Sequence, residues 1–258
     1  METIRLISGY AMPTLGLGTW AMRGKECKAV VKTAIKLGYT HIDTAWMYDN
    51  QRDIGEAIQE IGVARSDLFI TSKIWQTHLK YNDVLSQCDE CLQQLQTDYV
   101  DLLLIHWPNE AVPMEETLDA FNKIHDAGKA KSIGVSNFSI DQVNRAREVS
   151  QAPICMNQVE YNVRHNQEAL LVHCTRHQVM ITAHRPLAKG QVIHEPILSA
   201  IAEEHGKTAA QVALRWLRQK GIIAIPKSSS ESHLRENLDM FDWNLTPEEM
   251  EQINNISG

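Results

Sequence analysis

Short apolar runs alternate along the chain with longer amphipathic segments. The apolar runs are rich in leucine and β-branched residues and cover residues 14–20, 41–45, 67–73, 99–107, 130–138, 154–161, 179–186 and 221–228. Because they are nearly continuous, they predict parallel strands that are covered on both faces. The segments between them repeat apolar residues at helical spacing and predict helices over residues 25–38, 52–62, 82–96, 114–128, 140–149, 166–177, 195–206, 208–221 and 231–241.

This alternation predicts eight strand–helix units, repeated about every 30 residues. Eight is the number of parallel strands that closes a (β/α)8 TIM barrel. Residues 4–16 precede the first unit and predict an N-terminal β-hairpin, turned at Ser8 and Gly9, that covers the bottom of the barrel. No linker or change of composition divides the chain, so we expect a single barrel domain over residues 1–258.

Composition narrows the class of protein without choosing a reaction. With 43% hydrophobic and 22% charged residues, the chain is ordinary for a globular protein with a large core. A net charge of -7 argues against a nucleic-acid partner, because phosphate binding needs a basic face. The N-terminus lacks a secretory pattern and the apolar run at residues 102–105 is far too short to cross a bilayer. We therefore expect a cytoplasmic protein with no membrane partner.

Cysteines and histidines are too scattered to predict a metal site. The five cysteines are odd in number, and Cys88 and Cys91 form a lone C-x-x-C within a predicted helix. His173 and His177 lie four apart on another predicted helix, a spacing that can bind metal, but no third ligand is evident. We predict neither a disulfide framework nor a metal site.

Polar residues follow several predicted strands and are candidates for a shared site. Asp43, Lys73 and His106 end the second, third and fourth strands, and Tyr48 lies in the loop after Asp43. Taken singly, Asp43 could cap the helix that starts near Gln51, Lys73 could be a solvated strand end, and His106 could be a core histidine. In a barrel, however, the C-terminal ends of all strands converge on one face, so these side chains become neighbours.

Together these residues predict a proton donor with an electrostatic partner. Lys73 would be partly desolvated at the barrel rim and would need the counter-charge of Asp43. A positive charge next to Tyr48 favours the phenolate, so we expect Lys73 to lower the Tyr48 pKa and make its hydroxyl a better acid. His106 would give the same oxygen a second hydrogen bond. Such a site suits protonation of a carbonyl oxygen as hydride reaches the carbon.

Long motifs in the order and spacing of one known family run through the whole chain. After the opening hairpin they are LGLGTW, GYTHIDTAWMYDN, ITSKIW, TDYVDLLLIHWP, IGVSNF, NQVEY, RPLAKG and IPKSSSESHLREN. By these motifs the chain resembles the aldo-keto reductases. The resemblance implies that Asp43, Tyr48, Lys73 and His106 form a catalytic tetrad and that the cofactor is NADPH or NADP.

The resemblance also assigns cofactor contacts. It implies that Ser136, Asn137 and Gln158 hydrogen-bond the nicotinamide carboxamide and that Leu187 lies in the motif that straps the pyrophosphate. The further cofactor residues that it implies are Gly18, Thr19, Trp20, His184, Arg185, Lys227, Ser228, His233, Glu236 and Asn237.

The residues before the last predicted helix favour a phosphate for physical reasons as well. Lys227 and several hydroxyls precede a predicted helix N-terminus, where backbone amides and the helix dipole favour a phosphate. This favours NADP(H) over NAD(H); the alternative is a plain serine-capped helix. His233 stands where the family usually has an arginine, although Arg235 is close, so the affinity for NADPH should be weaker or pH-dependent.

Two further departures from the family lie beside the predicted nicotinamide. His184 stands where a tyrosine usually stacks on the ring, and Arg185 stands where a serine is common. An imidazole can still stack but offers less area than a phenol, so we expect weaker cofactor packing.

Four tryptophans at strand ends predict the substrate pocket. They are Trp20, Trp46, Trp75 and Trp107, and an aromatic barrel mouth suits a carbonyl substrate with apolar neighbours. The sequence ends soon after the last predicted helix, and the loops after the fourth and seventh strands look short. We expect an open pocket for small aldehydes, α-dicarbonyls such as methylglyoxal, and keto-sugars.

Two other functions were weighed against carbonyl reduction. A sensor that holds NADPH without turnover would not need Tyr48, and a metal-dependent barrel hydrolase would need more ligands than Asp43 and His106. The G-x-G of residues 16–18 lacks the third glycine and the acidic residue of a Rossmann fingerprint. Reduction by a monomeric enzyme is the function we expect.

Overall fold

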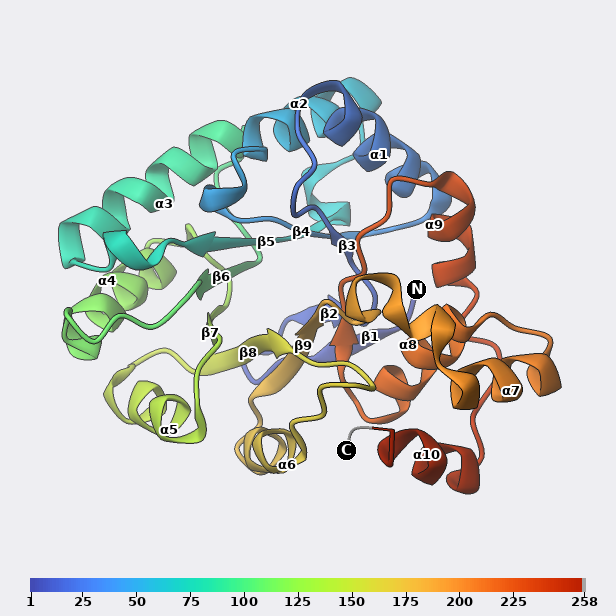
Figure 1. Cartoon of the computed structure of the whole chain (residues 1–258). Coiled ribbons are helices and arrows are strands. Elements are labelled where there is room, and N and C mark those ends of the chain that lie inside the picture. The colour runs from blue at the N-terminus through green and yellow to red at the C-terminus, as the bar shows by residue number, and fades with distance from the viewer. Residues whose placement is uncertain (257–258) are drawn as a thin grey trace.

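Eight parallel strands lie side by side in sequence order, and helices cover their outer face (Figure 1). The computed structural model describes residues 1–256. The strands are β3 (Leu17–Gly18), β4 (His41–Asp43), β5 (Phe69–Ile74), β6 (Leu102–Ile105), β7 (Ile133–Ser136), β8 (Ile154–Glu160), β9 (Met180–His184) and β10 (Ile223–Ala224). Each falls within one of the eight predicted apolar runs, except that β5 extends one residue beyond its run.

The two outermost strands of the sheet meet and close the barrel. Leu15 forms a parallel bridge with Ala224, and the Gly18 N–H donates to the Pro226 carbonyl at 3.1 Å. A Cβ built on Gly18 would lie 2.6 Å from the Ile225 carbonyl oxygen, so the two strands can approach this closely only at a glycine. The predicted TIM barrel is confirmed.

All nine predicted helices are present, with ends that differ from the predicted ones by a few residues. They are α1 (Gly24–Leu37), α2 (Gln51–Ile61), α3 (Tyr81–Leu95), α4 (Met114–Asp126), α5 (Ile140–Val149), α6 (Glu168–Arg176), α7 (Pro196–His205), α8 (Ala209–Gln219) and α9 (Glu231–Leu238). The short 3-10 helices η1 (Trp46–Tyr48), η2 (Arg65–Asp67), η3 (Gln76–His78) and η4 (Ala188–His194) were not predicted. Because η4 occupies the connection after β9, that loop is longer than predicted.

One α-helix was missed, although its start signal is local. Helix α10 (Pro247–Asn254) begins with a capping box: the Thr246 side chain accepts from the Glu249 N–H, and the Glu249 carboxylate accepts from the Thr246 N–H. Pro247 occupies the first turn, where its missing N–H costs nothing. The pattern Thr-Pro-Glu-Glu was therefore readable as a helix start.

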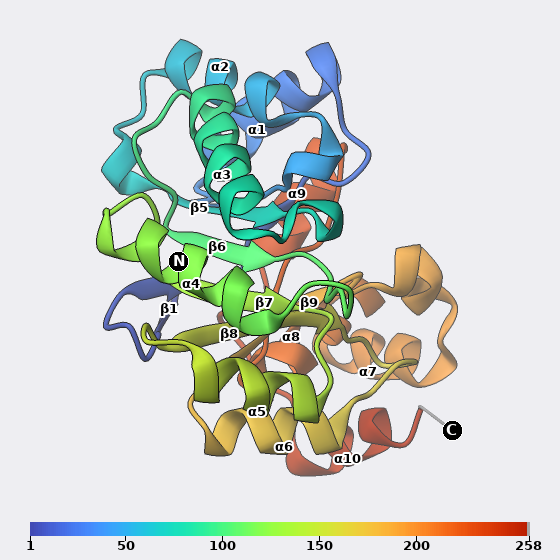
Figure 2. The ribbon, with the colours of Figure 1, turned by 90° about the vertical axis from the view of Figure 1, so that its left-hand side faces the viewer.

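The predicted hairpin closes the bottom of the barrel. Strands β1 (Thr3–Arg5) and β2 (Ala11–Pro13) are antiparallel, and Gly9 in their turn has φ of 91°. Figure 2 shows this hairpin at one end of the parallel strands. Its buried side chains, and the barrel side chains that they cover, form an apolar plug of Leu6, Met12, Phe69, Leu102, Leu104, Cys155, Met156 and Ile223.

The five cysteines are free and buried. Burial raises the pKa of the Cys88 thiol to about 12 and that of Cys91, also on α3, to about 11. Both thiols are therefore poor nucleophiles, since the thiolate is the reactive form. Within residues 1–256, each helix is too short or too polar to serve as a membrane span.

Candidate active site

Asp43 and Lys73 form a buried ion pair at the C-terminal ends of adjacent strands. The Lys73 Nζ lies 2.6 Å from Asp43 Oδ1 and also donates to the Thr44 carbonyl at 2.8 Å. Lys73 is 0% exposed, more deeply buried than the rim position predicted for it. Asp43 does not cap α2, whose N-cap residue is Asn50. The capping alternative is therefore wrong for Asp43.

Burial and pairing act against each other on this ion pair. Burial raises the pKa of Asp43, opposed by Lys73 and by the Gln158 amide, which donates to Asp43 Oδ2 at 2.7 Å. For Lys73, burial favours the neutral amine, but Asp43 and Tyr48 together outweigh it and raise the pKa. The ammonium is thus held in its charged form beside Tyr48.

Tyr48 ends η1 and contacts the ammonium. Its hydroxyl lies 3.4 Å from Lys73 Nζ, and the Nζ lies 4.9 Å from the ring centroid. Lys73 lowers the Tyr48 pKa, as predicted, but burial is the larger effect and the pKa is raised overall. The expectation of a lowered pKa is wrong, because it left out the cost of a buried phenolate.

His106 follows β6 and completes the group of aromatic rings. Its ring meets those of Tyr48 and Trp75 edge-on, with centroids 5.6 and 5.1 Å apart. Burial, with the charge of Lys73, lowers the pKa of His106 to about 2. The imidazole is therefore neutral at physiological pH and has one N–H to donate. Its Nδ1 is buried and has no protein partner.

The residues predicted to hold the carboxamide form one hydrogen-bonded row. The Asn137 side-chain amide donates to the His106 carbonyl at 2.9 Å and to Ser136 Oγ at 3.0 Å, and Asn137 Oδ1 lies 3.1 Å from His184 Nε2. Ser136 Oγ donates to the Gln158 carbonyl at 2.7 Å. Burial lowers the pKa of His184 to about 4, so a neutral imidazole occupies this position.

Arg185 is held in place by a partner that the sequence analysis missed. Its guanidinium lies 2.8 Å from Glu160 Oε2, and its backbone has φ of 51°. Glu160 lies two residues beyond Gln158 on β8, hence on the same face of the strand, and this spacing could have revealed it. Leu187 lies in the same β9–α7 connection, half-buried directly before η4.

The predicted phosphate-binding residues surround the start of α9. Lys227 is exposed, and Ser228 Oγ accepts from the Ser230 N–H at 3.1 Å. Ser230 is the N-cap residue, but its side chain makes no capping hydrogen bond, so the plain capping alternative is wrong. His233 is exposed, and Arg235 is paired with Glu231 of its own helix at 2.7 Å.

The other predicted cofactor residues lie after β3 and on α9. Thr19 is buried and donates its hydroxyl to the Asp43 carbonyl at 2.8 Å, directly after Gly18. Asn237 is buried on α9, and Glu236 is half-buried beside it.

Two of the four predicted substrate tryptophans are widely exposed. Trp20 is 56% and Trp107 44% exposed, while Trp75 is half-buried. The Trp20 ring meets Tyr48 edge-on at 5.1 Å. Trp46 is held by Glu90, a residue not predicted from the sequence: the Trp46 Nε1–H donates to the Glu90 carboxylate at 2.8 Å. No sequence signal connects these two residues.

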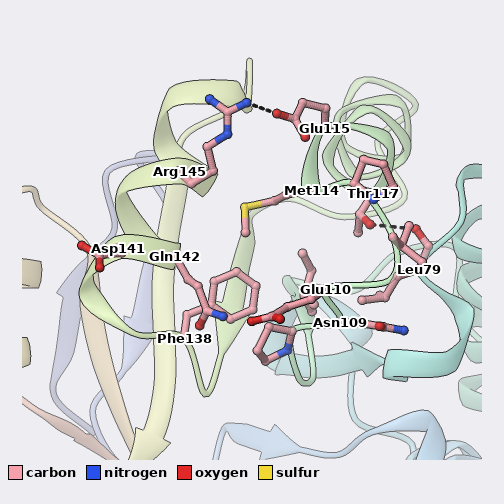
Figure 3. Close-up of a pocket in the computed structure, with 14 residues that line it drawn as sticks. Leu79, Asn109, Glu110, Met114, Glu115, Thr117, Phe138, Asp141, Gln142 and Arg145 are labelled. Carbon is pink, nitrogen blue, oxygen red and sulfur yellow. Dashed lines mark hydrogen bonds and ion pairs between the residues drawn. The ribbon is translucent and has the colours of Figure 1, made fainter.

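Two cavities flank this face. One of about 360 Å³ is lined by Trp107, Asn137, Glu160, His184 and Arg185, among others, and so joins the predicted nicotinamide and substrate residues. The other, of about 420 Å³, lies between α4 and α5 (Figure 3). Met114 and Phe138 line it, and an ion pair joins Glu115 and Arg145. None of the four predicted catalytic residues lines either of these two cavities.

The arrangement of the four residues suits one kind of chemistry. It presents a phenol hydroxyl to the barrel mouth, with a buried cation behind it and a neutral imidazole beside it. A phenol so placed can give a proton to an oxygen, and the cation stabilises the phenolate that is left.

Comparisons with known proteins identify the family of the chain. Residues 14–257 match the aldo/keto reductase family model. Glyoxal reductase of Bacillus subtilis (strain 168) is 40% identical over 257 residues, which cover 99% of this chain and 93% of that protein.

Solved structures share the whole fold. A thermostable aldo-keto reductase in complex with the inhibitor epalrestat is 40% identical, with a TM-score of 0.95 and 100% of each chain covered. An aldo-keto reductase complexed with NADPH is 32% identical, with a TM-score of 0.95, covering 100% of this chain and 88% of the other. Since the family model, the sequence relatives and the solved structures all cover nearly the whole chain, the chain belongs to the aldo/keto reductase family of oxidoreductases.

Proposed function

We propose that this enzyme uses NADPH to reduce small aldehydes, α-dicarbonyls such as methylglyoxal, and keto-sugars to alcohols. The observation that carries the proposal is the Tyr48 hydroxyl, 3.4 Å from a buried ammonium that is itself paired with Asp43. A binding protein would have no need to bury such a pair behind a phenol, because the desolvation of two buried charges offsets much of their attraction.

Tyr48 acts as the general acid. Its pKa is raised by burial, so the hydroxyl stays protonated at physiological pH and is ready to donate. Lys73 stabilises the phenolate that forms when the proton leaves, and Asp43 keeps Lys73 charged and in position. Neutral His106 donates its N–H to the same carbonyl oxygen and orients it towards Tyr48.

The residues on this face fit a nicotinamide cofactor, which supplies the hydride when bound. Buried Ser136 and Gln158 and half-buried Asn137 offer amide and hydroxyl groups in one row, and Asn137 lines the cavity of about 360 Å³. Lys227 and the uncapped amides at the start of α9 suit the phosphate that distinguishes NADPH from NADH. Because Arg235 is already paired with Glu231, the preference for NADPH rests mainly on Lys227 and these amides.

The substrate range follows from the exposed tryptophans. Trp20, whose ring meets Tyr48, and Trp107, which lines the cavity of about 360 Å³, form open apolar walls with about half of each residue in solvent. Open walls hold a small carbonyl compound but give little discrimination between substrates, since each methylene in an apolar pocket contributes only about 1–3 kcal/mol. The relative named glyoxal reductase is consistent with small dicarbonyl substrates.

The test is NADPH consumption with a panel of small carbonyls, run for the wild type and for Tyr48→Phe. We expect turnover to fall by about 10²–10⁴-fold in the variant, the usual contribution of a general acid, with NADPH still bound. Tyr81→Phe, on α3 and away from the site, is the matched control. Wild-type binding of NADPH without turnover of any carbonyl would instead identify a cofactor sensor.

His184 tests the cofactor geometry separately. We propose that its imidazole stacks on the nicotinamide with less contact than a phenol gives. His184→Tyr should then tighten NADPH binding by about threefold to tenfold, in line with one additional aromatic contact. Titration of NADPH fluorescence measures this, and an unchanged or weaker affinity would contradict the stacking role.

A further inference from the structure

The 3-10 helix that carries Tyr48 is tied to α3 through its first residue. Trp46 begins η1 and Tyr48 ends it. The Trp46 indole N–H donates to Glu90 Oε2 at 2.8 Å, and its ring lies 5.1 Å from that of His78. The position of Tyr48 is therefore coupled to Glu90, which lies on a different strand–helix unit.

Glu90 is in turn connected to the strand that carries Lys73. Ser72, next to Lys73 on β5, donates to Gln51 Oε1 at 2.6 Å, and Gln51 Nε2 donates to Gln94 Oε1 at 3.1 Å. Gln94 Nε2 then donates to Glu90 Oε1 at 2.9 Å. These side chains bridge α2 and α3, which lie side by side (Figure 1). A continuous row of hydrogen bonds thus runs from Ser72, the neighbour of Lys73, to Trp46, which lies on the same 3-10 helix as Tyr48.

The direction of these bonds makes the carboxylate essential. Every donor in the row points towards Glu90, from Ser72 on one side and from Trp46 on the other. A carboxylate has only acceptors and can end two such rows at once. A glutamine has a single acceptor oxygen, and its NH2 group would face either the Trp46 N–H or the Gln94 NH2.

We propose that Glu90 is a positioning residue that braces η1 against β5 and so holds the Tyr48 hydroxyl in contact with Lys73. The proposal rests on the proposed role of Tyr48 as the acid. The Lys73 Nζ and the Tyr48 hydroxyl are 3.4 Å apart, which is already long for a hydrogen bond. A small outward shift of η1 therefore ends this contact. The Glu90 side chain touches neither the tetrad nor the proposed cofactor residues, and its effect passes through Trp46.

The direct test is Glu90→Gln, which keeps the size of the side chain. We expect kcat to fall by about tenfold, the consequence of losing one charge-assisted hydrogen bond that aligns the acid. The Kd for NADPH should stay within about twofold, because Glu90 makes no hydrogen bond to the proposed cofactor residues. The KM for the carbonyl is not a control here, since the Glu90 partner Trp46 is itself a predicted substrate residue.

The pH profile gives a readout that a purely structural role would not change. The charged and titratable groups that face Tyr48 are Lys73, Asp43, Arg185 and His106. Of these, Lys73 is the strongest influence that lowers the pKa of Tyr48. Loss of the contact with Lys73 raises the pKa of Tyr48, whereas loss of burial lowers it, so withdrawal of Tyr48 should move the basic limb of the kcat profile.

The matched control is Asp89→Asn on the same helix. It removes one negative charge, as Glu90→Gln does, but Asp89 pairs with half-buried Lys129 at 2.5 Å and not with η1. It should leave kcat and the pH profile unchanged. Trp46→Phe, combined with Glu90→Gln, should add little to either single loss, since both remove the same bond.

A measurement without turnover separates this proposal from the proposed function. The carbon-13 resonance of Tyr48 Cζ, assigned by its absence in Tyr48→Phe, reports whether the hydroxyl still contacts Lys73. It should shift in Glu90→Gln and not in Asp89→Asn, even if no carbonyl is reduced. Should Glu90→Gln not fold, Gln94→Met cuts the same row and should shift the resonance in the same direction. An unshifted resonance in Glu90→Gln would overturn the positioning role of Glu90. So would additive losses of kcat when Trp46→Phe and Glu90→Gln are combined.

Discussion

The two ends of the barrel interior differ in chemistry, although the same strands line both. On β5, Phe69 joins the apolar plug at the bottom, whereas Lys73, four residues on, is a buried cation at the top. On β6, Leu102 lies in the plug and His106 directly follows the strand at the top. Alternate residues of a strand point to the same face, so residues four apart both face the barrel interior. On β5 and β6 the inward side chains therefore change from apolar to ionisable over about four residues.

This difference separates stability from chemistry within one domain. The plug is dry, is covered by the hairpin and contributes free energy of folding by burying apolar area. The top buries an ion pair, which contributes little to stability because desolvation of the charges offsets their attraction. The lower half therefore provides a rigid base on which the upper half can hold groups in electrostatically costly positions.

Lys73→Met should break the upper half most severely. It leaves Asp43 buried without its counter-charge, so we expect a loss of about 3–5 kcal/mol in the free energy of unfolding and no measurable turnover. The loss should grow as pH rises from about 4, because burial raises the pKa of Asp43 and the folded state then favours its protonated form.

Urea unfolding at several pH values measures this. Lys32→Met removes a surface partner of Glu60 and should cost no more than about 1 kcal/mol at any pH. A Lys73→Met protein as stable as the Lys32→Met protein at neutral pH would contradict the costly burial of Asp43.

Leu104→Ala should produce the opposite result in the plug. Leu104 is 0% exposed, and its truncation leaves a cavity that should cost about 2–5 kcal/mol of stability. We expect kcat to change by less than about twofold, because the variant leaves the groups at the top in place. Unfolding curves and steady-state kinetics on one preparation test both, and a large fall in kcat would show that the two halves are not independent.

The stability of the wild type should fall in acid, with His41 as one cause. His41 lies on β4 below Asp43, and burial, with Lys73, lowers its pKa to about 3. The unfolded state, with a histidine pKa near 6.5, binds a proton first, so stability decreases from about pH 6.5 downwards by about 1.4 kcal/mol per pH unit for each such histidine.

His41→Gln should reduce the slope of stability against pH by the contribution of one histidine. The exposed His194 provides the control, since His194→Gln should leave the slope of stability against pH as it is in the wild type. An equal slope in all three proteins would mean that His41 takes up a proton in the folded state as well.

The smallest effect is expected at the hairpin turn. Gly9 has φ of 91°, and a Cβ there meets no atom within 4 Å, so Gly9→Ala tests backbone strain alone. We expect a loss of about 1–2 kcal/mol with unchanged kcat. Thermal unfolding measures the loss, and a fall in kcat would indicate that the bottom of the barrel affects the site after all.

Most of the fold and the outline of the site were readable in the sequence, for a local reason. Strands and helices depend on the spacing of apolar residues, and α10 was missed although its capping box was equally local. Asp43, Lys73 and His106 came from a general rule, that the C-terminal ends of barrel strands converge on one face. That rule predicts which side chains meet and says nothing of their distances.

The tertiary structure alone decided the balance of forces in the site. The pKa of Tyr48 is raised because burial outweighs Lys73, and the depth of burial depends on packing among all eight strands. The pairing of Glu160 with Arg185 and of Glu90 with Trp46 depends on side chains from different strand–helix units. The sequence by itself therefore determined the barrel and the identity of the candidate reactive groups. Their charge states and alignment arose only from long-range packing, because electrostatic energies depend on distance and on the exclusion of water.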